Sequence, residues 1–159
     1  MKAMLAILLL LVPLAAQAAE PKPFAEGSWQ ALQQAHHGRP TLVHFWGLTC
    51  APCLIELPQW ARFARERRDA DIVMVGADPV AERPADLAKA LTKAGLDEVE
   101  SWRFADDFAE RLQYEVDPAW HGELPFTVLL ASDGTSRTVL GTVDFAELNA
   151  WLGRQKPQP

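Results

Sequence analysis

The sequence predicts an α/β fold in which a mixed central β-sheet is covered by helices on both faces. Three apolar segments, at 42–46, 71–77 and 126–131, have the β-branched and aromatic composition of buried strands. Helical segments separate them, and strands separated by helices pair in parallel through right-handed crossovers. Asp133-Gly134, after the third segment, predicts a hairpin turn that adds antiparallel strands at one side.

The first residues have the pattern of a leader. Lys2 supplies a positive charge, residues 5–12 form an unbroken apolar run, and Ala16 and Ala18 place small residues where a signal peptidase requires them. The run is shorter than the roughly 20 apolar residues of a membrane-spanning helix. We therefore expect cleavage after Ala18 and a periplasmic location, with an uncleaved signal that tethers the protein to the membrane as the alternative.

The rest of the chain suits one domain. A length of 159 residues leaves too little sequence for a second hydrophobic core. We expect a short tether at 19–27, a single domain at 28–154 and a frayed tail at 155–159.

Local signals delimit the helices. Ser28 is expected to cap a first helix that runs to His37. The next helix begins at Thr49 or Cys50, with Pro52 in its first turn, where amide donors are unpaired in any case. Further helices are expected at 84–94, 106–114 and 144–152, and the returning strand of the hairpin at 137–143.

The charge balance argues against a nucleic-acid partner. Fifteen Lys and Arg residues stand against 21 Asp and Glu residues, for a formal net charge of −6. A protein that binds nucleic acid normally presents a basic face.

We expect a monomer with no bound cofactor.

Cys50 and Cys53, the only two cysteines, carry the chemistry. A disulfide across two intervening residues closes almost no loop, so it would stabilise the fold little. Haem attachment requires a histidine directly after the second cysteine, and Leu54 stands there. A zinc site needs two more ligands at suitable spacing, which are absent.

A dithiol/disulfide redox pair explains the two cysteines best. A strand followed at once by a helix places Cys50 at a helix N-terminus, where thiol pKa values fall to roughly 3.5–7.5 from ~8.5. Cys50 would attack a partner's disulfide, and Cys53, one helical turn later, would resolve the mixed disulfide.

The segment "FWGLTCAPCLIELP" (45–58) resembles the active-site segment of the thioredoxin superfamily, and most closely its exported TlpA/ResA-type branch. The resemblance continues at "ELPFTVLL" and "SDGTSRTVLG" and covers roughly residues 38–151. It implies a thioredoxin-like fold and a cis peptide bond before Pro125. It also implies that the loop at Leu124 and Pro125 packs against the cysteines and pairs with an extended partner segment.

Two residues depart from the family pattern. Thr49 replaces the tryptophan that usually precedes the first cysteine, so the rim of the site is expected to be more open or more polar. His44 occupies the strand position where thioredoxins carry a buried acid. Strand alternation places it on the same face as Leu42 and Trp46. It is either a proton relay to Cys53 or a satisfied core histidine.

Glu56 follows Cys53 by three residues, which places both on one helix face. Apolar neighbours would raise the pKa of its carboxyl group. The resembling branch tends to carry a glutamate here that is linked to proton handling. The alternative is an ordinary exposed glutamate.

The resulting prediction is a periplasmic thiol–disulfide oxidoreductase. The resemblance implies that it reduces disulfides of exported proteins, as in cytochrome c maturation or at metal-site cysteines, with electrons from a membrane donor. A disulfide oxidase or isomerase, and a partner-binding module that rarely turns over, remain alternatives. So does a copper chaperone that would use Cys50, Cys53 and His121, because two thiolates and an imidazole suit Cu(I).

Overall fold

The computed structural model describes residues 20–78, 83–106 and 108–155. The expected leader with its cleavage site, and most of the expected tail, lie outside these residues. In chain order the elements are β1 (Lys22–Phe24), α1 (Ser28–Ala35), β2 (Thr41–Trp46), α2 (Ala51–Glu66), β3 (Asp71–Gly76), α3 (Pro84–Ala94), β4 (Glu100–Phe104), α4 (Ala109–Val116), β5 (Phe126–Leu130), β6 (Ser136–Leu140) and α5 (Phe145–Gly153).

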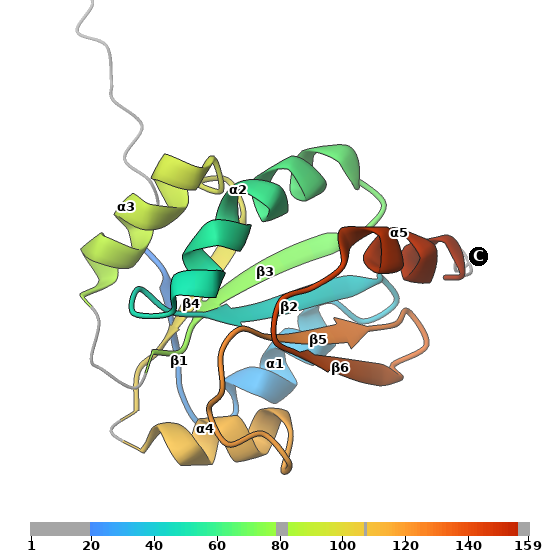
Figure 1. Ribbon diagram of the computed structural model, residues 1–159. Helices are drawn as coiled ribbons and strands as arrows, with labels where there is room; N and C mark the ends of the chain where they lie inside the picture. The colour runs from blue at the N-terminus through green and yellow to red at the C-terminus, as the bar shows by residue number, and fades with distance from the viewer. Residues whose placement is uncertain (1–19, 79–82, 107, 156–159) are drawn as a thin grey trace, which may run out of the picture.

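Six strands form one mixed sheet in the order β1-β4-β3-β2-β5-β6. The pairs β1–β4, β4–β3 and β3–β2 are parallel, whereas β5 is antiparallel to both β2 and β6. Helices α2, α3 and α5 cover one face, and α1 and α4 cover the other (Figure 1). The predicted fold class is confirmed.

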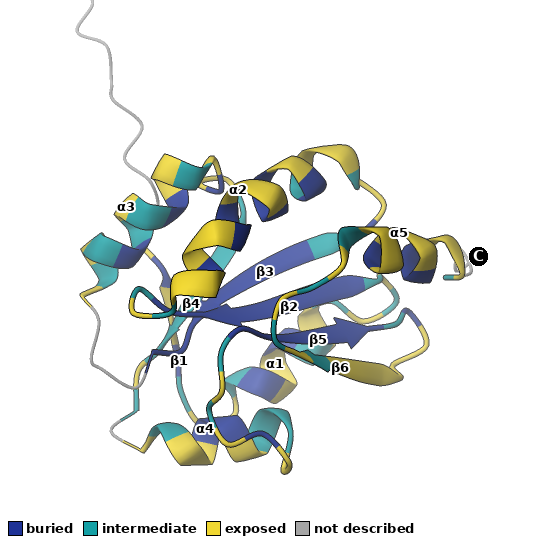
Figure 2. Cartoon of the chain, viewed as in Figure 1, coloured by how far each residue is buried: buried dark blue, intermediate teal, exposed yellow. Residues whose placement is uncertain are grey.

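Two apolar cores lie on opposite faces of the sheet. Every residue of β2 is buried, so its side chains alternate between the two cores (Figure 2). Leu42 and Trp46 pack toward Trp60 of α2 in one core. Phe45 lies in the other core, with its ring centroid 4.8 Å from that of Trp120. Because apolar cores cover both faces of β2, the strand that leads into the cysteine segment is held in place within the sheet.

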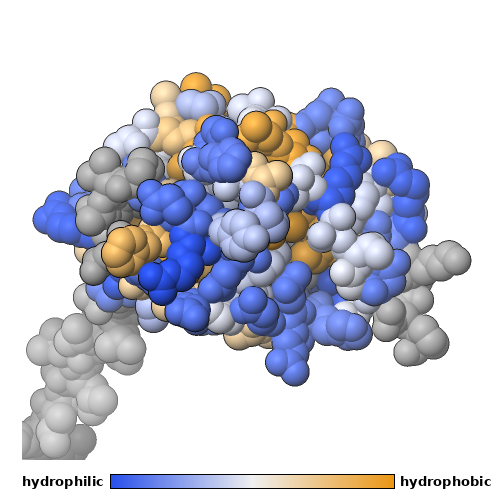
Figure 3. All heavy atoms as spheres, turned by 90° about the horizontal axis from the view of Figure 1, so that it is seen from below, coloured by the Kyte–Doolittle hydropathy of each residue, from blue (hydrophilic) through white to orange (hydrophobic). Residues whose placement is uncertain are grey.

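The surface seen from the side of α1 and α4 is mostly hydrophilic, with scattered apolar side chains (Figure 3). Phe108 and Tyr114 are the large apolar side chains most exposed near or on α4, at 61% and 66%. Within the described residues, no helix is long and apolar enough to cross a membrane.

The expected tether at 19–27 is wrong for the segment Lys22–Phe24, which is an edge strand of the sheet. It pairs in parallel with β4, with Phe24 opposite Phe104. The Phe24 side chain is fully buried, and its ring stacks on Phe104 at 5.4 Å. Strand β4 was not predicted from the sequence either. All five of its residues are half-buried, so it lacks the continuous apolar run of a central strand.

Two helix boundaries differ from the prediction. Gly27, with φ of 80°, is the N-cap of α1, and the Ser28 Oγ accepts a hydrogen bond from the Ala25 amide instead of capping the helix. The helix ends at Ala35. Helix α4 starts later than expected because the Asp106 carboxylate accepts a hydrogen bond from the Phe108 amide, which forms a turn before the helix.

Other boundaries agree with the prediction. Cys50 is the N-cap of α2, with Pro52 in the first turn. Helix α3 runs from Pro84 and ends at Gly95, whose φ of 80° suits a glycine. Asp144 caps α5, because its Oδ1 accepts hydrogen bonds from the amides of Ala146 at 2.7 Å and of Glu147 at 3.4 Å.

Replacing Asp144 with alanine is expected to lower the free energy of unfolding by about 1 kcal/mol, because the amides at the start of α5 lose their acceptor. Urea unfolding followed by circular dichroism measures this change. Asp144→Asn keeps a capping oxygen and serves as the control. Equal midpoints for Asp144→Ala and the unmodified protein would contradict the capping role.

Candidate active site

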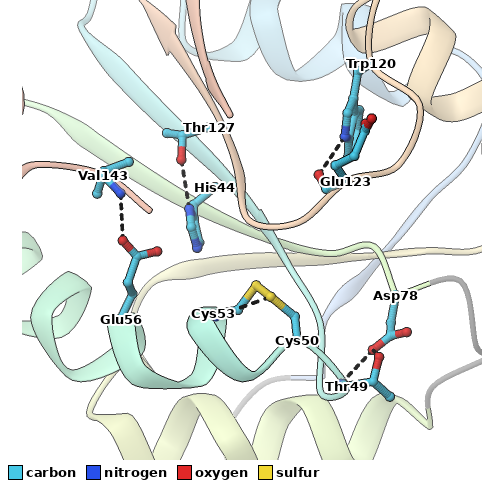
Figure 4. Close-up of a disulfide and its surroundings, with 10 residues drawn as sticks. All are labelled: His44, Thr49, Cys50, Cys53, Glu56, Asp78, Trp120, Glu123, Thr127 and Val143. Carbon is cyan, nitrogen blue, oxygen red and sulfur yellow. Dashed lines mark hydrogen bonds between the residues drawn. A yellow bond between two sulfur atoms is a disulfide. The ribbon is translucent and has the colours of Figure 1, made fainter. Parts of the chain in front are cut away.

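Cys50 and Cys53 are joined by a disulfide with an S–S distance of 2.00 Å (Figure 4). The first turn of α2 holds both residues. Cys50 is half-buried at the N-cap, and its Sγ accepts a hydrogen bond from the Cys53 amide at 3.3 Å. Cys53 is fully buried. One sulfur therefore lies at the surface and the other is enclosed.

The position of Cys50 follows from the elements on either side of it. Strand β2 ends at Trp46, a turn follows in which the Cys50 amide donates to the Gly47 carbonyl, and α2 begins at Ala51. The free amides and the dipole of a helix N-terminus favour a thiolate over a thiol. The location predicted for the first cysteine is confirmed.

The peptide bond between Leu124 and Pro125 is cis, as the resemblance implied. Pro125 is buried, and its carbonyl accepts a hydrogen bond from the Gly141 amide at 2.8 Å. Leu124 and Cys50 both pack against the core that contains Cys53. Leu124 and Cys50 therefore pack against the same core, although more than 70 residues separate them in sequence.

Trp120 supports this loop and was not predicted from the sequence. Its indole N–H donates to the Glu123 carbonyl at 2.9 Å (Figure 4). Its ring stacks on Phe126, with the ring centroids 4.5 Å apart. The available signal was an isolated tryptophan five residues before the proline, which fits many roles.

His44 is fully buried on the face predicted for it. Its Nδ1 lies 2.9 Å from the Thr127 Oγ1, and its ring is 4.7 Å from that of Trp60. Burial lowers the pKa of His44 to about 3, so the imidazole is neutral at physiological pH. Its Nε2 is buried without a hydrogen-bond partner among the described residues. Only one of the two ring nitrogens of this buried histidine therefore has a hydrogen-bond partner among the described residues.

Glu56 is 3% exposed, so the alternative of an ordinary exposed glutamate is wrong. The Val143 amide donates to its Oε1 at 2.7 Å, and its Oε2 has no hydrogen-bond partner within the described part of the chain. Desolvation raises the pKa of the Glu56 carboxyl group, and the hydrogen bond from Val143 opposes part of the effect. In Figure 4, His44 and Glu56 lie on the Cys53 side of the disulfide.

A Glu56→Gln variant tests the raised pKa. In the native protein the protonated carboxyl group contributes stability below the unfolded-state pKa of 4.5, and this contribution is lost as pH rises through the higher folded-state pKa. We therefore expect the native protein to lose stability relative to Glu56→Gln between acidic and neutral pH. Urea unfolding across that range measures the difference. Glu66→Gln, at the exposed end of the same helix, is the control; if both variants give the same trend, burial of Glu56 is not the cause.

Thr49 is exposed, as expected for a polar rim, and two hydrogen bonds to a buried side chain hold it in place. Its amide and its hydroxyl group both donate to the Asp78 Oδ2, at 2.7 Å and 2.6 Å (Figure 4). Asp78 follows β3 and is 8% exposed. Asp78 could not be predicted from the sequence, because 29 residues separate it from Thr49.

The first turns of α2, which hold the disulfide, also carry exposed apolar side chains. Leu54 is 40% exposed and Ile55 is 72% exposed, and both follow Cys53 directly on α2. Ala51 and Pro52 are exposed as well. Trp46, by contrast, is a core residue, so it cannot contact a partner.

The structure does not support a copper site at His121. No group of three or more His, Cys, Asp and Glu side chains that could hold a metal ion occurs among the described residues, which include both cysteines and His121. His121 is exposed, and its amide donates to the Glu123 side chain. Among the described residues, with the two cysteines joined in the disulfide, His121 is not grouped with Cys50 and Cys53.

Solved structures from several bacteria have a similar fold. A secreted disulfide oxidoreductase of Mycobacterium tuberculosis, homologous to E. coli DsbE, aligns with a TM-score of 0.60 at 20% identity, over 76% of this chain and 84% of that chain. StoA from Bacillus subtilis gives 0.53 at 22% identity, over 72% and 83%. The exposed lipoprotein thioredoxin Etrx1 of Streptococcus pneumoniae gives 0.59 at 17% identity, over 76% and 88%.

No family model matches the sequence, and no curated protein matches it either. The assignment therefore depends on the strand order, the cysteine pair at the start of α2, the cis bond before Pro125 and the structural neighbours. These observations agree with one another, and the chain has the thioredoxin-like fold.

Proposed function

We propose that this protein is a thiol–disulfide oxidoreductase that cycles Cys50 and Cys53 between a dithiol and a disulfide. The observation that carries the proposal is the disulfide at the N-terminus of α2, with one half-buried and one buried sulfur, in the same core as the cis Leu124-Pro125 loop. A disulfide that closes so short a loop stabilises the chain little. We therefore infer that the disulfide has a chemical role and not a structural one.

The reaction is a two-electron exchange. The Cys50 thiolate attacks one sulfur of a partner's disulfide, forms a mixed disulfide and releases the partner's other sulfur as a thiolate. Cys53 then loses its proton and attacks the Cys50 sulfur, which releases the partner's second thiolate and forms the Cys50–Cys53 disulfide. The partner gains two electrons and this protein loses two.

Glu56 and His44 are the groups available to handle the proton of Cys53. Cys53 is buried, so its proton cannot pass directly to bulk water. Glu56 has a raised pKa and an unpartnered oxygen, and His44 is neutral with an unpartnered nitrogen. A general base works best when its pKa lies near the working pH. Because burial raises the pKa of Glu56 and lowers that of His44, Glu56 is the better proton acceptor of the two and His44 stays neutral.

The partner is a protein segment in an extended conformation. Exposed Leu54 and Ile55 offer apolar contacts beside the disulfide, and the backbone at Leu124 can pair with such a segment. The leader predicts an extracytoplasmic location. The names of two neighbours, a secreted oxidoreductase and an exposed lipoprotein thioredoxin, support this location. The partners would then be disulfides of exported proteins, including apocytochromes or metal-site cysteines, and a membrane donor would supply the electrons.

The test uses the leaderless protein and insulin as a model disulfide substrate. We expect the reduced protein to accelerate insulin reduction by dithiothreitol, and Cys50→Ser to abolish the acceleration. A midpoint potential near that of thioredoxin, about −270 mV, supports the reducing direction, whereas a value near that of a strong oxidase, about −120 mV, supports an oxidase. A protein that neither reduces nor oxidises model disulfides would refute the proposal.

A further inference from the structure

A buried carboxylate lies directly below the segment that presents Cys50. Asp78 is 8% exposed, and its Oδ2 accepts hydrogen bonds from both the amide and the hydroxyl group of Thr49. Thr49 is the residue immediately before Cys50. Figure 4 shows Asp78 on the Cys50 side of the disulfide, opposite the side that holds His44 and Glu56.

The backbone is shaped to admit this carboxylate. A Cβ atom placed on Gly47 would lie 2.7 Å from the Asp78 Oδ2 and 2.9 Å from its Cβ, closer than real Cβ contacts. Gly47 is therefore a glycine because the Asp78 side chain occupies the space beside it. Strand β3 brings Asp78 there, since Trp46 pairs with Gly76 and the Ala77 amide donates to the Trp46 carbonyl at 2.8 Å.

We propose that Asp78 is a positioning residue for the Cys50–Cys53 pair and that its charge biases the pair toward the reducing direction. The two hydrogen bonds to Thr49 hold the turn at residues 47–49 and so fix the position of the Cys50 sulfur. This inference rests on the proposed function, because it assigns a direction to the exchange at the same cysteines.

The sign follows from electrostatics. A negative charge near a thiolate disfavours the thiolate and raises the pKa of the thiol. The Asp78 carboxylate therefore opposes the helix N-terminus, which favours the thiolate. Because the thiolate belongs only to the reduced form, opposing it favours the disulfide and makes the protein a stronger reductant.

The test compares Asp78→Asn with the unmodified protein. Asparagine keeps the volume and an acceptor oxygen but removes the charge. The pKa of Cys50 is measured by its rate of alkylation by iodoacetamide as a function of pH, and the redox equilibrium is measured against glutathione. We expect the Cys50 pKa to fall by about one unit. We also expect the equilibrium to move about tenfold toward the reduced form, which is ~30 mV for a two-electron couple.

Glu66→Gln is the matched control, because it removes one negative charge from the exposed C-terminal end of α2. If Asp78→Asn and Glu66→Gln give the same Cys50 pKa and the same glutathione equilibrium, the proposal is overturned. Both measurements need only the protein and small thiols. A protein that shows the shift but neither reduces nor oxidises protein disulfides would refute the proposed function, while the effect of Asp78 on the cysteine pair would still stand.

Thr49→Val provides a second variant in case Asp78→Asn does not fold. It removes the hydroxyl donor that disperses the carboxylate charge, while the charge itself remains. We expect the pKa of Cys50 to rise and the glutathione equilibrium to move two- to threefold toward the disulfide, opposite to the effect of Asp78→Asn. Thr49→Ser retains the donor and is expected to match the unmodified protein. Unchanged values in Thr49→Val would overturn the proposal.

Discussion

A Cys53→Ala variant is expected to accumulate as a mixed disulfide with its substrate, because it can complete the first exchange but not the second. Cys50 is half-buried at the N-cap of α2, whereas Cys53 is fully buried. Only the first sulfur can reach a partner, and only the second can release it. Non-reducing electrophoresis of Cys53→Ala incubated with oxidised insulin should show a new band that dithiothreitol removes.

The reciprocal variant distinguishes the two cysteines. Cys50→Ala retains the buried sulfur of Cys53 and is expected to form no mixed disulfide and to lower the reduction rate to that of dithiothreitol alone. The double variant Cys50→Ala/Cys53→Ala is the control for non-covalent binding. If Cys50→Ala traps substrate as well as Cys53→Ala does, the assignment of the attacking and resolving residues is wrong.

Below pH 6.5, His44 is expected to make the protein lose stability by about 1.4 kcal/mol per pH unit. The unfolded chain binds a proton at His44 with the ordinary pKa of 6.5, whereas burial lowers the folded-state pKa to about 3. Between these two values the unfolded state holds more protons, so acid favours unfolding. The loss ends near pH 3, where the folded state also binds the proton.

His44→Asn removes this titration, and its unfolding free energy should fall less steeply with acid than that of the native protein. Urea unfolding between pH 7 and pH 4 measures the two slopes. Because asparagine is smaller, a constant loss of stability from the cavity is expected at every pH. The exposed residue His37 gives the control variant His37→Asn. Parallel pH curves for His44→Asn and the native protein would contradict a neutral buried imidazole.

Much of the fold could be predicted because its central elements carry strong local signals. Strand β2 is apolar along its length, Gly95 ends α3, and the Asp133-Gly134 turn joins β5 to β6. The two strands at the other side of the sheet, the edge strand β1 and its neighbour β4, could not be predicted. β1 has only three residues and β4 is half-buried throughout, so each depends on its partner for its conformation.

The candidate site divides in the same way. Cys50, Cys53 and Pro125 carry a motif that is recognisable in sequence, and Glu56 lies within one turn of Cys53. Asp78 and Trp120 carry no local signal of their roles. Asp78 acts through Thr49, which it meets only because β2 and β3 are adjacent.

The sequence by itself determined the reactive pair, the helix start that presents Cys50 and the α/β class, because these depend on spacing and on short-range backbone preferences. The tertiary structure decided which side chains are buried away from water and which polar and charged groups lie close together. Burial of His44 and Glu56 sets the direction of their pKa shifts. Strand order places Asp78 below Thr49. Desolvation and Coulomb interactions depend on distances through space, and residues far apart in the chain acquire those distances only when the sheet forms.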